Sequence, residues 1–261
     1  MLKSMPALLG ASLLVITAPS YAALYDITYT GVVSSGYDQT GVFLGQNTDL
    51  AGQAFTAVFT LNYPVPSGAY EYDDGQTHYA YGGDAYATGT PSFLSGKITI
   101  NGKTDTVSGQ YQSYPWLQNL PGQDYVWDES SDYDQSDPNK YSYSYIQSWI
   151  QSTNDNYLTG TSLTQSINYV ADSNDSVGGY FSFDEHDANT GVYEKYAYGY
   201  LSPSSVTVSV SAVPEQSTWA MMITAFGFAG TAFRRRKSNE ERRRFSAFPA
   251  ATGIETDAAT A

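Results

Sequence analysis

Three pairs of adjacent carboxylates are the residues of this sequence whose types could perform acid–base chemistry. They are Asp73-Asp74, Asp128-Glu129 and Asp184-Glu185. Hydrolysis of a glycosidic bond needs two carboxyl groups about 5–10 Å apart across a cleft, one of them with a raised pKa. Adjacent residues of a β-strand point to opposite faces of the sheet. None of the pairs is therefore a hydrolytic site by itself, and a secreted glycoside hydrolase is the least favoured of the functions considered.

The chain has two histidines, His78 and His186, and no cysteine. His186 lies in the run from Asp184 to Asp187, which could be a metal or acid–base cluster. Zinc sites usually need at least three convergent ligands, and the motifs H-E-x-x-H, G-x-S-x-G and G-x-x-x-x-G-K-[ST] are absent from the sequence. Without cysteine there is no disulfide framework, no Cys-ligated metal and no thiol nucleophile. We predict no catalytic residue, no resident metal or cofactor, and no enzymatic activity.

Two aspartate-rich stretches resemble calcium-binding loops. They run from Asp132 to Asp137 and from Asp172 to Gly178. Both lack the EF-hand spacing, with Gly at position six and Glu at position twelve. Two interpretations remain open: weak binding of Ca²⁺, or turns in which the Asp side chains cap their own backbone.

The charge of the central part of the chain limits its partners. Residues 23–212 contain 21 acidic residues, four lysines and no arginine, which gives a formal charge of −17. Such a surface repels the phosphates of nucleic acids. We therefore exclude nucleic acid as a partner.

The same residues hold most of the 24 tyrosines of the chain and three tryptophans, Trp116, Trp127 and Trp149. Tyr and Trp join a flat apolar face to a polar edge, as sugar-binding surfaces require. They are also good strand formers, so a place in the core is the favoured interpretation. A carbohydrate-binding module is the first alternative function.

Period-two alternation of apolar and polar residues predicts antiparallel strands, most clearly from Tyr25 to Thr30 and from Phe55 to Tyr63. Asn101-Gly102 predicts a hairpin from Ile98 to Val107, because Asn-Gly tolerates the positive φ of a type I′ turn. Further strands are expected at 141–150, 166–171, 179–183, 191–200 and 205–212, and loops at 71–89 and 112–139. About eight strands of this kind predict an all-β fold, an antiparallel β-sandwich or barrel-like domain.

Residues 1–22 have the pattern of a secretory signal peptide. Lys3 supplies a positive charge, residues 7–18 are apolar, and Ser20-Tyr21-Ala22 places small residues where a signal peptidase cuts. We expect cleavage between Ala22 and Ala23. Residues 23–212 are then an exported β-rich domain, long enough for one substantial core.

The segment 213–237 has three parts. Pro214-Glu215 is followed by an uncharged run from Trp219 to Phe233 and then by Arg234, Arg235, Arg236 and Lys237. The run is short against the roughly 20 residues of a full span. The cations would hold its C-terminal end on the cytoplasmic side, and Trp219 would lie at the opposite interface. We predict a transmembrane helix here.

This segment resembles the C-terminal sorting domain of PEP-CTERM proteins, in the form whose apolar part opens with Trp-Ala. The resemblance is carried by Pro214, Glu215, Trp219, Ala220, Met221, Met222, Gly227, Gly230 and the cluster of Arg234, Arg235 and Arg236. Gln216 stands where the family has its second proline. Residues 238–261, which we expect to be a disordered tail, extend beyond the usual end of such domains.

The resemblance implies recognition by an exosortase, an integral-membrane cysteine protease, and transient anchoring in the inner membrane of a Gram-negative bacterium. It also implies a final place at the cell surface or in the extracellular matrix, where exopolysaccharide is a candidate partner. We therefore expect an exported, transiently membrane-anchored surface or matrix protein without a catalytic role.

Overall fold

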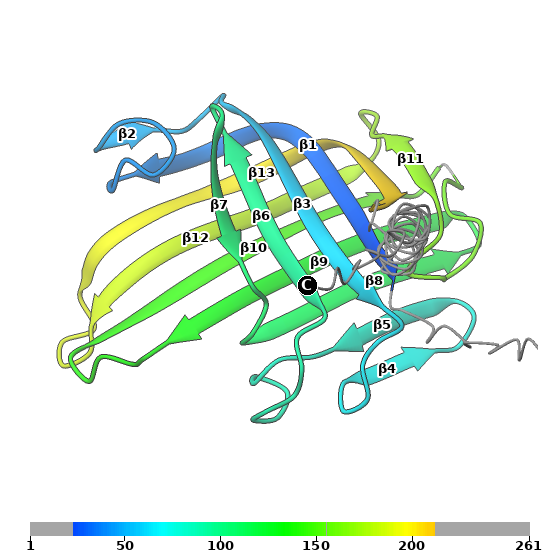
Figure 1. Cartoon of the computed structure of the whole chain (residues 1–261). Coiled ribbons are helices and arrows are strands. Elements are labelled where there is room, and N and C mark those ends of the chain that lie inside the picture. The colour runs from blue at the N-terminus through cyan, green and yellow to red at the C-terminus, as the bar shows by residue number, and fades with distance from the viewer. Residues whose placement is uncertain (1–22, 155, 212–261) are drawn as a thin grey trace, which may run out of the picture. The chain divides into compact units, whose positions relative to one another are not determined.

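The computed structural model describes residues 23–154 and 156–211, and all regular structure in this part of the chain is β-strand (Figure 1). No helix among these residues has the length and hydropathy of a membrane span. The predicted signal peptide, with Ala22 at its end, lies outside the described residues. So do the segment 213–237 with every residue of the predicted sorting signal, and the tail 238–261.

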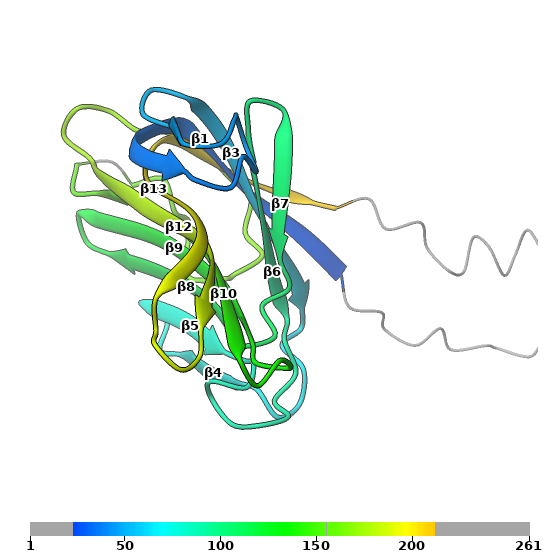
Figure 2. The same ribbon diagram turned by 90° about the vertical axis from the view of Figure 1, so that its left-hand side faces the viewer.

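Thirteen strands form one antiparallel sheet with the order β4-β5-β8-β9-β10-β12-β13-β1-β3-β6-β7, and β2 and β11 pair with β1 and β13 beside this path. The strands are β1 (Ala23–Asp38), β2 (Thr48–Asp49), β3 (Ala54–Tyr63), β4 (Tyr70–Asp73), β5 (Thr77–Tyr81), β6 (Leu94–Ile100), β7 (Lys103–Val107), β8 (Gln112–Leu120), β9 (Gln123–Asp134), β10 (Lys140–Ser152), β11 (Ile167–Val170), β12 (Ser176–Asp187) and β13 (Tyr193–Val210). The sheet curls, so that β3, β6 and β7 lie over β8, β9 and β10 (Figures 1 and 2). The predicted all-β antiparallel class is confirmed, in the form of a curled half-barrel.

The hydrophobic core fills the inside of the curl. Both halves of the sheet contribute side chains that are almost completely buried, among them Ile27, Phe59, Leu61, Leu94, Ile98, Leu117, Val126, Ile146 and Phe181. Burial of an aliphatic or aromatic side chain of this size contributes roughly 1.5–3 kcal/mol. The core therefore fixes which face of each strand points inward and which points to solvent.

The clearest sequence patterns are confirmed. Ile27 and Tyr29 in β1 are buried, and so are the alternate residues from Phe55 to Leu61 in β3. The predicted hairpin is formed by β6 and β7, with Ile100 opposite Lys103. Asn101 and Gly102 have φ values of 52° and 76°, as a type I′ turn requires.

The two predicted loops are wrong over much of their length. The range 71–89 contains most of β4 and all of β5, and the range 112–139 contains β8 and β9. Prolines and acids indicated a loop, but here Pro115 and Asp128 are buried partners on neighbouring strands. Pro121-Gly122 forms only the two-residue turn between Leu120 and Gln123. Because the inward faces of β8 and β9 carry residues such as Pro115 and Asp128, the second range lacked the apolar alternation of a strand.

The last two predicted strands are one continuous strand, β13. Pro203 falls between the two predicted ranges and indicated a break. It lies opposite Gly31, at a register shift between β1 and β13. A Cβ at Gly31 would come within 2.2 Å of the carbonyl oxygen of Ser202, so only glycine permits this approach. The bulge accommodates Pro203, which has no amide hydrogen for the ladder.

Candidate functional site

Aromatic side chains cover the outward face of the half of the sheet that runs from β4 to β13, a surface that we call the outer face. Along β8, β9 and β10 every second residue, such as Leu117, Val126 and Ile146, is buried in the core, so the intervening residues point outward. The outward aromatic residues of these strands are Tyr70, Tyr72, Tyr79, Tyr81, Tyr114, Trp116, Tyr125, Trp127, Tyr133, Tyr141, Tyr143, Tyr145, Trp149, Tyr180, Tyr196, Tyr198 and Tyr200.

The rings on the outer face contact one another across neighbouring strands. Tyr81 and Tyr114 are stacked, with centroids 4.1 Å apart and planes at 9°. Tyr114 contacts Trp127 edge-on at 5.1 Å, and Trp127 lies 5.6 Å from Trp116. The indole N–H groups of both tryptophans have no hydrogen-bond partner among the described residues. Such contacts hold the rings in fixed orientations and form a rigid aromatic surface.

Two hollows lie at opposite sides of the outer face. The first, of about 460 Å³, is lined by Tyr70, Tyr79, Tyr81, Gly82, Ala85, Tyr86 and Gln112. The second, of about 410 Å³, is lined by Tyr180, Ser182, Tyr193, Tyr196, Tyr198 and Tyr200. Both hollows are open to solvent and are walled by tyrosine rings. Their lining offers flat apolar surfaces edged by hydroxyl groups.

Strand register places polar residues between the two hollows. Glu129 pairs with Tyr114 on one side and with Gln147 on the other. Gln147 in turn pairs with Tyr180, and Tyr180 with Tyr200. One row of cross-strand partners therefore passes from the first hollow, over a carboxyl and an amide group, to the second.

Glu129 is 8% exposed, and burial raises the pKa of its carboxyl group, although the neighbouring Tyr145 hydroxyl opposes this shift. The Tyr145 hydroxyl donates its one proton to Oε1 of Gln147 over 2.7 Å. Burial and then the charge of Glu129 raise the pKa of Tyr145. The middle of the outer face thus holds a small hydrogen-bonding group surrounded by rings.

The predicted carboxylate pairs are divided between the two faces of the sheet. Asp128 points into the core, whereas Glu129 lies on the outer face. Asp184 accepts hydrogen bonds from Ser182 and His186, whereas Glu185 bonds the lysines at 140 and 195. These bonds lower the pKa of Glu185 to about 2. The expectation that adjacent acids point apart is confirmed for both pairs.

The two remaining acids, Asp73 and Asp74, are used by a turn. Asp74 accepts the amide N–H groups of Gln76 and Thr77, and Asp73 accepts that of Gly75. On the outer face, Glu129 and Asp184 are two strands and four residues apart, which separates their Cα atoms by about 16 Å. This separation exceeds the roughly 5–10 Å between the carboxyl groups of glycosidases.

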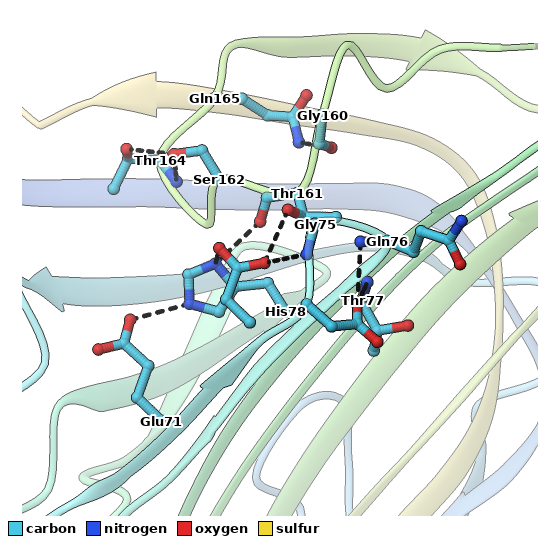
Figure 3. A network of polar contacts seen from close by, with 12 residues as sticks. Glu71, Gly75, Gln76, Thr77, His78, Gly160, Thr161, Ser162, Thr164 and Gln165 are labelled. Atoms are coloured by element: carbon cyan, nitrogen blue, oxygen red, sulfur yellow. Dashed lines mark hydrogen bonds and ion pairs between the residues drawn. The ribbon is translucent and has the colours of Figure 1, made fainter.

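His78 joins the β4–β5 hairpin to the loop after β10 (Figure 3). It is 4% exposed. Its Nδ1 atom lies 3.0 Å from the carbonyl oxygen of Thr161, and its Nε2 atom lies 2.8 Å from Oε1 of Glu71. The Thr161 hydroxyl donates to Asp73 over 3.1 Å. These contacts satisfy groups of three chain segments, which is typical of a structural joint.

His186 lies among aromatic rings beside the second hollow. Its ring is stacked on Tyr141 at 4.4 Å and contacts Tyr193 at 4.1 Å. Its Nε2 atom is 2.8 Å from Asp184, and its Nδ1 atom has no hydrogen-bond partner among the described residues. The predicted Asp-Glu-His-Asp cluster is thus spread over both faces, with Asp187 capping the turn at Asn189 and Thr190.

The aspartate-rich stretches form turns that cap backbone groups. Asp132 accepts the amide N–H groups of Ser108 and Gln110, and Asp134 accepts that of Ser136. In the second stretch, Asp175 accepts the amide N–H of Asp172, and Asp172 accepts that of Asn174. Among the described residues no three carboxylate or imidazole groups converge as a metal site would require. Backbone capping is the arrangement that the structure supports.

No protein-family model matches the sequence, and no curated protein and no solved structure shows significant similarity to it. Function is therefore inferred from the side chains themselves. The sequence favoured the core over a sugar-binding surface for the aromatic residues, although only Tyr29, Tyr114 and Tyr169 of the described tyrosines are buried. The sequence feature that indicates an aromatic strand face is the period-two spacing of Tyr141, Tyr143 and Tyr145 and of the tyrosines at 196, 198 and 200. The sequence did not indicate that Glu129 would lie among these rings on the outer face.

Proposed function

We propose that the protein binds polysaccharide through the outer face. The observation that carries this proposal is the continuous set of Tyr and Trp rings on an outward surface, with a hollow at each side. Sugar rings have apolar faces and hydroxyl edges, and Tyr and Trp complement both features. A core function for these rings is disfavoured because Tyr200 and Tyr86 are 56% and 51% exposed.

The two ends of the chain supply the cellular context of this proposal. A signal peptide ending at Ala22 would export the chain, and the segment from Pro214 to Lys237 would anchor it until an exosortase-type protease acts. The β-rich part would then lie at the cell surface or in the extracellular matrix. Exopolysaccharide is the polymer present at such a place, so the proposed location supplies the ligand that the outer face is proposed to bind.

Glycoside hydrolysis is the less favoured function of the same face. It would need two carboxyl groups in reach of one glycosidic bond. Burial raises the pKa of Glu129, as a general acid requires, but the Cα atom of Asp184 lies about 16 Å from that of Glu129 along the sheet. Binding needs no such pair, and the arrangement supports binding over hydrolysis.

A glycan-binding experiment on the mature protein tests the proposal. Immobilised neutral, amino and acidic polysaccharides would be presented to the wild type and to the variants Trp116→Ala and Tyr200→Ala. We expect binding to at least one polysaccharide, weakened about tenfold (about 1.4 kcal/mol) by each variant. Val170→Ala is the control, because Val170 is 71% exposed on β11 and away from the outer face. Binding that is equal in all four proteins would exclude the outer face as the site.

A further inference from the structure

We infer that the outer face holds one uncharged polysaccharide chain that lies across the strands from the first hollow to the second. This inference rests on the proposed polysaccharide binding and adds the class of ligand, its direction and the residues that contact it. Three observations carry it: the row that joins the hollows, the polar groups midway along that row, and the placement of the lysines.

The row gives the direction of the chain. Tyr81 in the first hollow stacks on Tyr114, which pairs with Glu129. The row continues through Gln147 and Tyr180 to Tyr200 in the second hollow. From β5 to β13 the row crosses five strand spacings, or about 24 Å. An extended oligosaccharide can reach both hollows at once, whereas a disaccharide can occupy only one.

The polar middle of the row suits sugar hydroxyl groups. Gln147 accepts a hydrogen bond from Tyr145 at Oε1, which leaves its amide N–H groups to donate. Glu129 offers carboxyl oxygens, and its burial among rings makes each hydrogen bond there stronger than it would be in water. A hydroxyl group both donates and accepts, so it can bond the carboxyl and the amide side chain together.

The placement of the lysines selects an uncharged polymer. None of the four lysines among the described residues lies on the outer face: Lys97 is on β6 and Lys103 on β7. Lys140 and Lys195 both bond Glu185, on the opposite face of β12 from His186. A polyuronate or a sulfated chain would therefore meet Glu129 and Asp184 without a cation to pair with. Repulsion by the net negative charge of the domain acts in the same direction.

Titration calorimetry of the mature full-length protein tests the inference. The ligands are a neutral β-1,4-linked glucose or mannose hexasaccharide, the matching disaccharide, and a polygalacturonate of similar length. We expect the hexasaccharide to bind at least tenfold more tightly than the disaccharide, because two linked contacts reinforce each other. We expect polygalacturonate to bind at least tenfold more weakly than the hexasaccharide.

Variants separate one continuous site from two independent ones. Tyr86→Ala and Tyr200→Ala each change an exposed ring in one hollow. Each should reduce hexasaccharide affinity about tenfold or more and bring it close to the affinity of the disaccharide. Glu129→Leu should weaken the hexasaccharide similarly, and Glu129→Gln should restore most of the loss. Tyr133→Ala is the matched control, because Tyr133 is 44% exposed on the same face but four residues from Glu129 along β9.

The outcomes distinguish this inference from the proposed function. Equal affinities for the hexasaccharide and the disaccharide, or equal binding of polygalacturonate, would overturn the inference and leave polysaccharide binding standing. The same holds if Tyr86→Ala and Tyr200→Ala have no effect on the hexasaccharide. Failure of folded wild-type protein to bind any glycan would overturn both.

Discussion

The hydroxyl group of Tyr29 on β1 donates a hydrogen bond of 2.7 Å to Oδ2 of Asp128 on β9. Both side chains are fully buried, and the bond crosses the inside of the curl between strands that are not neighbours in the sheet. Burial raises the pKa of Asp128 to about 7. Burial, and then the nearby carboxylate, also raises the pKa of Tyr29. The outer face is therefore built on a layer that contains a buried titratable pair.

The first prediction concerns stability against pH. The pKa of Asp128 is about 7 when folded and about 4 when unfolded. Its protonated form stabilises the fold below pH 4, and this contribution is lost as the pH rises from about 4 to about 7. The loss is of the order of 4 kcal/mol. Asp128→Asn should remove this dependence and be more stable than the wild type at pH 8.

Urea unfolding at pH 4, 5.5, 7 and 8 measures the effect. Asp137→Asn is the control, because Asp137 is exposed and caps only a local turn. The control should keep the wild-type slope of stability against pH. A slope that is unchanged in Asp128→Asn would show that the buried carboxyl group does not titrate between these limits.

The second prediction concerns Asp38, at the end of β1. Its carboxylate accepts the amide N–H groups of Gly41, Val42, Phe43 and Leu44. Burial alone would raise its pKa, but these hydrogen bonds outweigh burial and lower it. The stability that it contributes is therefore present above about pH 4 and is lost as the pH falls through the lowered value. Asp38→Ala leaves four donors without an acceptor and should cost roughly 3 kcal/mol at pH 7.

Thermal unfolding followed by circular dichroism checks this second prediction. Asp38→Asn keeps one acceptor oxygen and should lie between the wild type and Asp38→Ala. Asp49→Ala is the comparison, because among the described residues Asp49 accepts only the N–H of Ala51, in an exposed turn. Similar melting temperatures for Asp38→Ala and Asp49→Ala would contradict a special role for the buried carboxylate.

The fold class could be predicted from the sequence because alternation in β1 and β3 follows burial directly. The positions of β8 and β9 could not, because their inward residues include Asp124, Asp128 and Ser130. Such residues are stable inside the curl only through partners from distant strands, such as Tyr29, and a local pattern carries no information on those partners. The same limit explains Pro203, whose place in a strand depends on Gly31.

The candidate site was predictable in composition but not in place. The number of Tyr and Trp residues indicated either a core or a sugar-binding surface. The two interpretations differ only in whether the strand face that carries these residues points to the core or to solvent. Register decides this direction, since a shift of one residue would turn Tyr143 and Tyr145 inward. The row from Tyr114 through Glu129 to Tyr200 depends on four strand pairings, which the sequence alone does not reveal.

The third prediction concerns the joint at His78. His78→Ala removes the hydrogen bonds to Thr161 and Glu71, so the loop at 156–166 should open more often (Figure 3). We expect faster amide hydrogen exchange in residues 158–165, by about tenfold if opening becomes about 1.4 kcal/mol easier. His186→Ala is the matched control, because His186 contacts Tyr141 and Tyr193 and not this loop. Equal exchange in the two variants would show that His78 does not hold the loop.

The last prediction concerns the basic block Arg234 to Lys237, in the part of the chain outside the described residues. We propose that it stops translocation and holds the exported protein until cleavage near Pro214-Glu215 releases it. Moving each cation into the membrane centre would cost roughly 2.5–3.5 kcal/mol, so four in succession form a strong barrier. Replacement of Arg234 to Lys237 by Ser or Asn should reduce the membrane-bound fraction of the protein on cell fractionation and alter its rate of processing. The second cluster, Arg242 to Arg244, is the control, because it lies five residues beyond Lys237 and its replacement leaves the proposed stop intact. If the first variant stays as membrane-bound as the wild type and is processed at the same rate, the basic block is not the stop signal. The sorting interpretation of residues 213–237 is then wrong for its basic part.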